Sequence, residues 1–357
     1  MKIKIFLRIM AGIAVILSIL PFIPLDFWWI RSFDFPHVQL TALTVIVFLL
    51  YCCYFKKQNI KDYIFTIILI VCILFQFLKI YPYTILSEVE VLDATTTESK
   101  GSLRIYTANV YQDNKKSKEL FSSIRKRDPD VLLFTETNSR WRDLINKELS
   151  DIYTFKTEAP FENTYGMLLF SKYELIDSSV QFLIEDTIPS IHSKMLLSAK
   201  DTIQLIAIHP APPVPQHNPS SVDRDAEMMK VAKKAQFSKY PVIVMGDFND
   251  VAWSETTELF QKVSGLLDMR KGRGLYNTYN AHNILFRWPL DHIFVSPEFR
   301  VITVEKGECI GSDHFPFFSE LSYEPQGTLE QQSAPPSKDD MEEGYDQIQN
   351  EREQEDS

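Results

Sequence analysis

Three long apolar runs occupy the first quarter of the chain. They cover residues 5–23, 38–55 and 63–80, and each is close to the roughly 20 residues that an α-helix needs to cross a bilayer. Three successive runs rich in Ile, Leu, Phe and Val are atypical of core helices in a water-soluble domain. The pattern therefore predicts three transmembrane helices within residues 1–84. The runs lack the polar residues of a transport pathway, so we interpret this region as a membrane anchor.

The first run resembles a signal peptide, because basic residues precede it. It has no small-x-small cleavage site before Pro21, and Trp28 and Trp29 follow as candidate interface anchors, so we expect an uncleaved helix. Basic residues begin the first span and separate the second from the third: Lys2, Lys4, Arg8, Lys56, Lys57 and Lys61. The positive-inside rule places both groups in the cytoplasm. The protein is then expected in the cell membrane, with everything after the third span on the extracytoplasmic side.

Residues 85–101, with three consecutive threonines and several acids, are expected to form a linker. Beyond them, short apolar runs alternate with helical patterns. Strand-like runs cover residues 103–109, 131–134, 166–171, 204–209, 241–245, 290–295 and 317–323, and helical spacing covers residues 117–127, 223–237 and 255–263. Strands that alternate with helices on this scale predict a layered α/β domain over residues 102–323.

Charge is unevenly distributed along the chain. Residues 100–323 hold 27 Lys and Arg against 29 Asp and Glu, whereas residues 324–357 hold 2 against 11. The central domain therefore lacks the broad basic surface of a non-specific nucleic-acid binder. Residues 324–357 are acidic and poor in apolar residues, which predicts a disordered acidic tail. The four cysteines leave one, Cys309, in the domain, so no disulfide within the domain is possible and no zinc spacing is present.

Polar residues with chemical potential gather where the predicted strands end. Asp247 and Asn249 follow the run at 241–245, and the others are Asn109, Glu136, His209, Asp291, Asp313 and His314. Taken singly, an Asp or Asn after a strand is as typical of a turn, and a lone histidine there is more often structural. Together they supply oxygen ligands for Mg²⁺ or Mn²⁺, a histidine beside carboxylates for proton transfer, and amide donors for an oxyanion. These are the components of phosphoester hydrolysis.

The order of these motifs resembles the endonuclease/exonuclease/phosphatase superfamily. The resemblance rests on Asn109, Glu136, residues 166–171, His209, the Gly-Asp-Phe-Asn sequence at 246–249, Leu-Asp-His-Ile-Phe at 290–294 and Ser-Asp-His at 312–314. It implies a four-layer α/β sandwich, in which two packed mixed β-sheets are flanked by helices, and a divalent metal. A three-helix anchor also occurs in some bacterial members.

The resemblance also implies a role for each residue. Glu136 would be the main ligand of Mg²⁺ (or Mn²⁺), Asp313 would lie near the metal, and Asn109 would contact metal-bound water or phosphate. Asp247 would position or deprotonate the attacking water, Asn249 would orient the water or the phosphate, and His209 would donate to the phosphate. His314, held in its tautomer by Asp291, would contact the phosphate or act as the base. The choice of base between Asp247 and His314 stays open at this point.

Nuclease members often place an acid two residues after the first-strand asparagine, where this chain has Tyr111, so a second metal site is in doubt. Candidate substrate contacts, each also readable as an ordinary loop residue, are Arg273, Tyr276, His282, Arg287, Trp288 and His217.

The leading hypothesis is a membrane-anchored, metal-dependent phosphoesterase that acts on a phosphodiester or phosphomonoester. Its substrate would be a nucleic acid, a phospholipid or a small phosphate ester, and no protein partner is implied. The alternative is a catalytically silent, membrane-tethered scaffold that keeps the fold.

Overall fold

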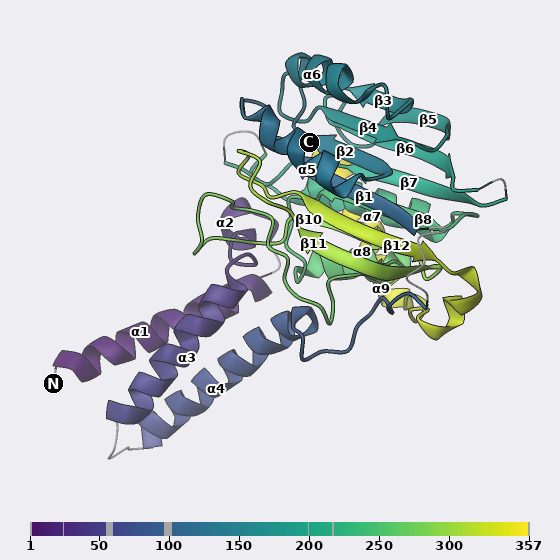
Figure 1. Cartoon of the computed structure of the whole chain (residues 1–357). Helices are drawn as coiled ribbons and strands as arrows, with labels where there is room; N and C mark the ends of the chain where they lie inside the picture. The colour runs from purple at the N-terminus through teal and green to yellow at the C-terminus, as the bar shows by residue number, and fades with distance from the viewer. Residues whose placement is uncertain are drawn as a thin grey trace.

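A computed structural model describes residues 2–23, 25–54, 60–95, 102–198, 200–215 and 218–355. A bundle of three long helices precedes a domain in which two β-sheets pack face to face between layers of helices (Figure 1). The predicted four-layer α/β sandwich, preceded by three long apolar helices, is confirmed.

The three anchor helices are α1 (Lys2–Ile19), α3 (His37–Tyr54) and α4 (Ile60–Ile80). The stretches long and apolar enough to cross a membrane are Ile5–Phe22, His37–Tyr54 and Ile60–Tyr83, in agreement with the sequence. The short helices η1 (Leu20–Phe22) and η2 (Tyr81–Tyr83) extend α1 and α4, and α2 (Trp28–Arg31) lies between α1 and α3. Apolar side chains such as Ile46, Leu49 and Ile67 are more than half exposed, as expected of a lipid-facing surface.

A few polar side chains join the anchor helices to one another. Asp62 of α4 accepts hydrogen bonds of 2.9 Å from Arg8 of α1 and from Tyr51 of α3, and Gln76 donates to Ser18. Hydrogen bonds of this kind between helices lower the cost of placing polar side chains in a membrane. They fit an anchor whose helices are fixed relative to each other.

The first sheet has the strand order β11-β12-β1-β2-β4-β3. Its strands are β1 (Ser102–Asn109), β2 (Val131–Thr135), β3 (Phe155–Ala159), β4 (Met167–Ser171), β11 (Phe299–Lys306) and β12 (Phe317–Tyr323). Strands β1 and β2 are parallel and the other pairs are antiparallel. Helices α5 (Ser117–Arg127) and α6 (Ser139–Leu149) pack on its outer face.

The second sheet has the order β5-β6-β7-β8-β10-β9. Its strands are β5 (Leu175–Phe182), β6 (Pro189–Leu196), β7 (Thr202–Ile208), β8 (Val242–Asp247), β9 (Leu267–Asp268) and β10 (Asp291–Val295). Strands β7 and β8 are parallel. Helices α7 (Val222–Gln236), α8 (Glu255–Ser264) and α9 (Lys338–Glu355) lie on its outer face.

Side chains that alternate along a strand face two different cores, one between the sheets and one under the helices. In β2, Val131 and Leu133 point into the core between the sheets, while Leu132 and Phe134 point outward to α5 and α6. Because both faces are covered, the strand is apolar throughout, which explains why the sequence shows a continuous apolar run there. Because it is buried on both faces, β2 is a rigid support for Glu136, the residue that follows it.

The predicted linker is partly integrated into the domain. Within its described portion, up to residue 95, Val91 is fully buried in the core between the sheets, and Ala94 donates to the carbonyl oxygen of Val301. These contacts hold the connection between anchor and domain against the sheet edge.

The prediction of a disordered tail is wrong for its described part. After η3 (Pro325–Glu330), helix α9 packs along α7 and α8, with Ile348 only 6% exposed. Glu351 pairs with Lys230 and Tyr345 receives the ammonium of Lys233 over its ring. Composition suggested disorder because α9 has few apolar residues, but its charged residues find partners on α7.

Candidate active site

The candidate residues lie where strands of both sheets end. Asn109 closes β1 and Asp247 closes β8, while Glu136 and His209 come directly after β2 and β7. Asp291 begins β10, which runs antiparallel to β8, and the pairing sets Asp291 opposite Asp247. Parallel strands end at one edge and antiparallel strands begin there, so the fold brings these side chains to one rim.

Close packing of backbone underlies this rim. A Cβ atom added to Gly246 would overlap the carbonyl oxygen of Ile208, because β7 and β8 approach closely just before Asp247. Glycine at 246, with φ of +146°, is therefore required by the site itself.

Two of the site residues have left-handed backbone. Glu136 has φ of 56° and Asn249 has φ of 51°, a conformation that costs free energy for residues other than glycine. Asn249 is held there by hydrogen bonds from its backbone N–H to Asp247 Oδ1 (3.0 Å) and from its Nδ2 to the carbonyl oxygen of Pro210 (2.9 Å). Such strained residues cluster at functional sites, where the surrounding contacts hold them in place.

Asn109 connects the two sheets through carboxylates. Its Nδ2 donates to Glu136 Oε1 at 2.8 Å and to Asp247 Oδ2 at 3.0 Å, and its Oδ1 accepts from the backbone N–H of Tyr111 at 3.0 Å. Asn109 is 1% exposed. In this arrangement it fixes the spacing between Glu136 and Asp247, and it presents its amide nitrogen to them.

His314 lies between two carboxylates. Its Nδ1 is 2.8 Å from Asp291 Oδ2 and its Nε2 is 3.5 Å from Asp247 Oδ2. Burial alone would lower the pKa of His314, but Asp291 and Asp247 outweigh it and raise the pKa to about 10. The imidazole is therefore a protonated donor at neutral pH, with Asp291 fixing its orientation.

His209 approaches the same carboxylate from the other side. Its Nε2 is 3.9 Å from Asp247 Oδ2, and burial lowers the pKa of His209, although Asp247 opposes this effect. Its ring lies 5.4 Å from that of Tyr165, and its buried Nδ1 has no hydrogen-bond partner in the described part of the chain. A neutral histidine with unused hydrogen-bonding capacity suits an oxyanion contact.

The donor set of the site fits a hard divalent cation. Burial raises the pKa of Glu136 to about 7, with Asp313 and Asp247 adding to this effect and the Asn109 hydrogen bond opposing it. Burial also raises the pKa of Asp247. One ligand atom from each of Asp247, Asp291 and His314 lies within 4.8 Å of the others. Carboxylate oxygens are the ligands that Mg²⁺ or Mn²⁺ prefers, and a bound cation would favour the ionised forms of Glu136 and Asp247 against the effect of burial.

The predicted substrate contacts divide into two groups. Trp288 stacks on Tyr279, whose ring is 4.9 Å from His314, and Arg287 lies over the ring of Phe315, so both are beside the site.

Two of the others have partners elsewhere in the domain and the segment before it. Arg273 pairs with Asp93, and Tyr276 packs against Phe317. His282 is exposed in the loop before Arg287, and His217 lies outside the described residues.

The structure adds residues that the sequence did not single out. Tyr279 and Tyr165 contact the two site histidines. Arg224, which is 2% exposed, pairs with Asp225 and Asp250 and donates to the carbonyl oxygen of Asn249 at 3.2 Å. An arginine at the start of a predicted helix carries no signal of such burial, so only the tertiary contacts reveal it.

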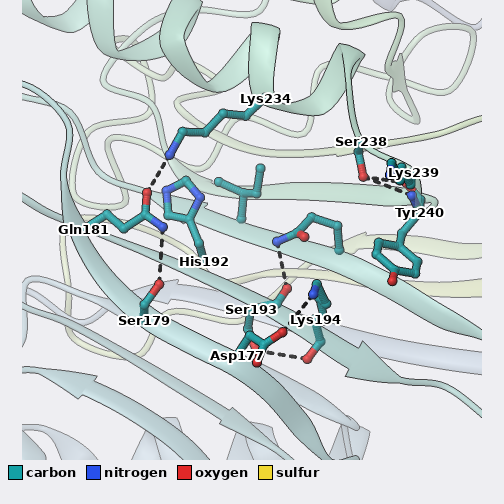
Figure 2. A pocket seen from close by; sticks show the side chains of 12 residues that line it. Asp177, Ser179, Gln181, His192, Ser193, Lys194, Lys234, Ser238, Lys239 and Tyr240 are labelled. Carbon is teal, nitrogen blue, oxygen red and sulfur yellow. Dashed lines mark hydrogen bonds and ion pairs between the residues drawn. The ribbon is translucent and has the colours of Figure 1, made fainter.

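A cavity of about 540 Å³ opens beside His209, lined by residues that include Tyr165, Ala211 and Pro212. A second cavity, of about 350 Å³, lies on the outer face of β5–β7 near the end of α7 (Figure 2). There Lys194 binds Asp177 and Lys234 binds Gln181, beside His192. None of the predicted site residues lines either cavity, but the first one adjoins the candidate active site through Tyr165, whose ring contacts His209.

Comparison with known proteins identifies the family of the domain. Residues 106–314, more than half of the chain, match the profile of the Endonuclease/Exonuclease/phosphatase family. No curated protein sequence matches.

Among solved structures, the fold is similar to the human Nocturnin catalytic domain with bound sulfate anion, with a TM-score of 0.51 at 17% identity over 68% of this chain and 99% of that one. It is also similar to a functionally unknown conserved protein from Enterococcus faecalis (TM-score 0.51, 18% identity, 62% of this chain and 100% of that one). D. rerio TDP2 complexed with single strand DNA product has a TM-score of 0.50 at 15% identity over 62% of this chain and 99% of that one. The chain belongs to the endonuclease/exonuclease/phosphatase family.

Proposed function

We propose that the chain hydrolyses a phosphodiester or phosphomonoester by in-line attack of water at phosphorus. The observation that carries the proposal is His314 held between Asp291 and Asp247, with Asn109 joining Asp247 to Glu136. Acid, base and metal-binding groups thereby converge from both sheets on one rim.

Glu136 would be the main ligand of Mg²⁺ or Mn²⁺, with Asp313 nearby and Asn109 positioning Glu136. When bound, the cation would offset the negative charge of the phosphate. This role fits the raised pKa of Glu136, since a neighbouring cation favours the ionised carboxylate.

The protein's own residues would handle the protons. We assign the role of base to Asp247, because Asp291 and Asp247 raise the pKa of His314 to about 10 and so favour its protonated form. His314 would then donate to a phosphate oxygen, and neutral His209 would contact another. Asn249, fixed by Pro210 and Asp247, would orient the water or the phosphate.

We further propose that the domain lies on the extracytoplasmic side of the cell membrane. Lys79 of α4 contacts Glu258 of the domain, and Asp34, just before α3, accepts from Trp253, so α3 starts and α4 ends beside the domain. The basic residues at the start of α1 lie at the opposite end of the bundle from these contacts, as the positive-inside rule requires.

The test is a hydrolysis screen with the full chain in detergent, on phosphodiesters, phosphomonoesters, nucleic acids and phospholipids, with Mg²⁺, Mn²⁺ or chelator. Asp247→Asn, His314→Gln and Asp291→Asn should each lower kcat by about 100-fold or more, as expected for loss of a proton-transfer group or of the residue that orients it. Asp177→Asn, at an exposed ion pair far from the rim, is the matched control. Metal-independent turnover, or unchanged rates in all three variants, would refute the mechanism. Silence on every substrate, with wild-type function in cells of Glu136→Gln, would establish the scaffold alternative.

A further inference from the structure

The loop between β9 and β10 exposes three consecutive large apolar side chains. Ile284 is 78% exposed, Leu285 69% and Phe286 52%. Single exposed apolar residues are ordinary on protein surfaces, but a contiguous group at a loop tip marks a contact surface. The elements next to this loop indicate what its apolar side chains contact.

The loop tip lies against the domain-side end of α3. Gln39 Nε2 donates to the carbonyl oxygen of Leu285 at 2.7 Å, and Val38 and Ala42 line the same cavity of about 570 Å³ as Ile284 and Leu285. Val38 and Ala42 are four residues apart on α3, which corresponds to about 6 Å along the helix axis. The loop tip therefore lies alongside the first turns of α3, a helix apolar enough to span a bilayer. In Figure 1 the green segment before β10 lies beside α2, at this end of the anchor.

Two cations line the same cavity. Arg287 and Lys306 both lie over the ring of Phe315, at 4.9 and 4.3 Å from its centroid. Arg287 donates to the carbonyl oxygens of Asn280 and Ala281, and neither cation forms an ion pair in the described part of the chain. Burial lowers the pKa of Lys306, with Arg287 adding to this effect. Exposed apolar side chains beside α3, in the same cavity as two cations without an ion pair in the described residues, match the two parts of a phospholipid, its acyl chains and its phosphate.

The other side of the loop reaches the catalytic rim. The backbone N–H of Ala281 donates to the carbonyl oxygen of Asp313 at 2.6 Å, and Tyr279 pairs with His314 in an isolated β-bridge. Trp288 stacks on Tyr279 and meets the edge of Phe35, in the segment that leads into α3. The loop therefore spans the distance between the membrane helix and the site.

We propose that the loop at residues 281–287 inserts into the adjacent leaflet and that the site takes its substrate from there, so that the substrate is a lipid with a phosphoester head group. This rests on the proposed function. Water would bond to phosphorus, one P–O ester bond would break, and the departing oxygen would take a proton. The products are an alcohol and a phosphate group with one ester bond fewer.

The activity test compares Ile284→Asp with Phe237→Asp in the full chain. Phe237, just after α7, is 74% exposed, but it lies at the far end of α7 from the anchor contact between Ser221 and Asp26. The two variants therefore make the same chemical change at similar exposure. Both are assayed in vesicles of phosphatidylethanolamine, phosphatidylglycerol and cardiolipin, by loss of each lipid, and on soluble bis(p-nitrophenyl) phosphate.

Ile284→Asp should lower lipid hydrolysis by about 10-fold or more, because a carboxylate resists entry into the bilayer, and should leave the soluble ester unaffected. Phe237→Asp should change neither rate. Turnover of the soluble ester without lipid hydrolysis, or equal lipid rates in both variants, would overturn the inference and leave the proposed function standing. No turnover of either substrate by the unmodified chain would refute the proposed function instead.

A second measurement does not depend on activity. Leu285→Cys and Phe237→Cys, in a chain whose four native cysteines are replaced by serine, are labelled with an environment-sensitive fluorophore and placed in vesicles that contain brominated lipids. Quenching at 285 but not at 237 is expected. Equal, weak quenching at both positions would overturn the insertion.

Discussion

Asn109 shows how one side chain integrates the two sheets at the scale of a residue. It ends β1 of the first sheet and donates both to Glu136, which follows β2 of the same sheet, and to Asp247, which ends β8 of the second sheet. An aspartate at position 109 would place a third carboxylate against these two and repel both. The amide is therefore the residue type that this position requires.

Glu227, on α7, is a buried carboxyl group outside the site. It is 3% exposed, and burial raises its pKa to about 8, with Lys230 opposing the effect and Glu185 adding to it. Because the pKa of Glu227 is raised in the folded state, its contribution to stability is fully present below the pKa of the unfolded chain. That contribution is lost as pH rises through about 8.

We predict that Glu227→Gln matches the natural chain in apparent Tm near pH 5 and exceeds it near pH 9. The corresponding difference in the free energy of unfolding should reach a few kcal/mol at most, since each pKa unit corresponds to about 1.4 kcal/mol. Thermal unfolding of the full chain in detergent across this range measures it, with the exposed Glu343→Gln as the control. Parallel pH profiles for the natural chain and Glu227→Gln would contradict the burial argument.

At the scale of an element, α9 adds a third helix to the outer layer of the second sheet. Its contacts with α7 combine Ile348 in the apolar cluster with the Lys230–Glu351 pair at 3.3 Å. Gly344 packs close to Met229 and Val263, where a side chain would be tightly constrained. The helix covers core residues that would otherwise face water.

Ile348→Ala should therefore destabilise the domain by about 2 kcal/mol or more, as for other large-to-small changes in a core. Leu329→Ala, at a residue 86% exposed, should have almost no effect. Apparent Tm of the two variants, measured side by side in detergent, decides the matter. If both variants melted like the natural chain, α9 would not be part of the folded unit.

At the scale of the whole molecule, the three-helix bundle is continuous with the α/β domain. Trp253 of the domain donates to the carbonyl oxygen of Asp34 at 2.7 Å, and Trp28 donates its backbone N–H to Pro219 near the start of α7. The apolar cluster around Trp253 includes Phe35 and Ile80 from the anchor. The domain is therefore held at a defined height and angle relative to the helices.

The proposed extracytoplasmic location can be tested with Cys309, an exposed cysteine on the catalytic domain. In a chain with Cys52, Cys53 and Cys72 replaced by serine, a membrane-impermeant maleimide should label Cys309 in intact cells. Replacing Cys309 as well provides the control for background labelling. Reaction only after the cells are lysed would place the domain in the cytoplasm.

Local patterns were sufficient for most elements. The runs at 131–134 and 317–323 became β2 and β12, and the spacing at 117–127 became α5, because apolar periodicity follows the repeat of each structure. The order of polar residues after strands was sufficient to nominate Glu136, Asp247 and His314, since strand ends are where a sheet exposes side chains to ligands.

By itself, then, the sequence determined the three apolar helices, the α/β sandwich and the identity of the groups at the rim. The tertiary structure decided what depends on distant residues meeting: which carboxylates hold His314, that Arg224 is buried, that Arg273 turns toward Asp93, and that the acidic C-terminal segment forms α9. It also decided that the loop at 281–287 meets α3, about 240 residues earlier in the chain. The physical reason is that composition and periodicity report on neighbours along the chain, whereas burial and ion pairing are set by neighbours in space.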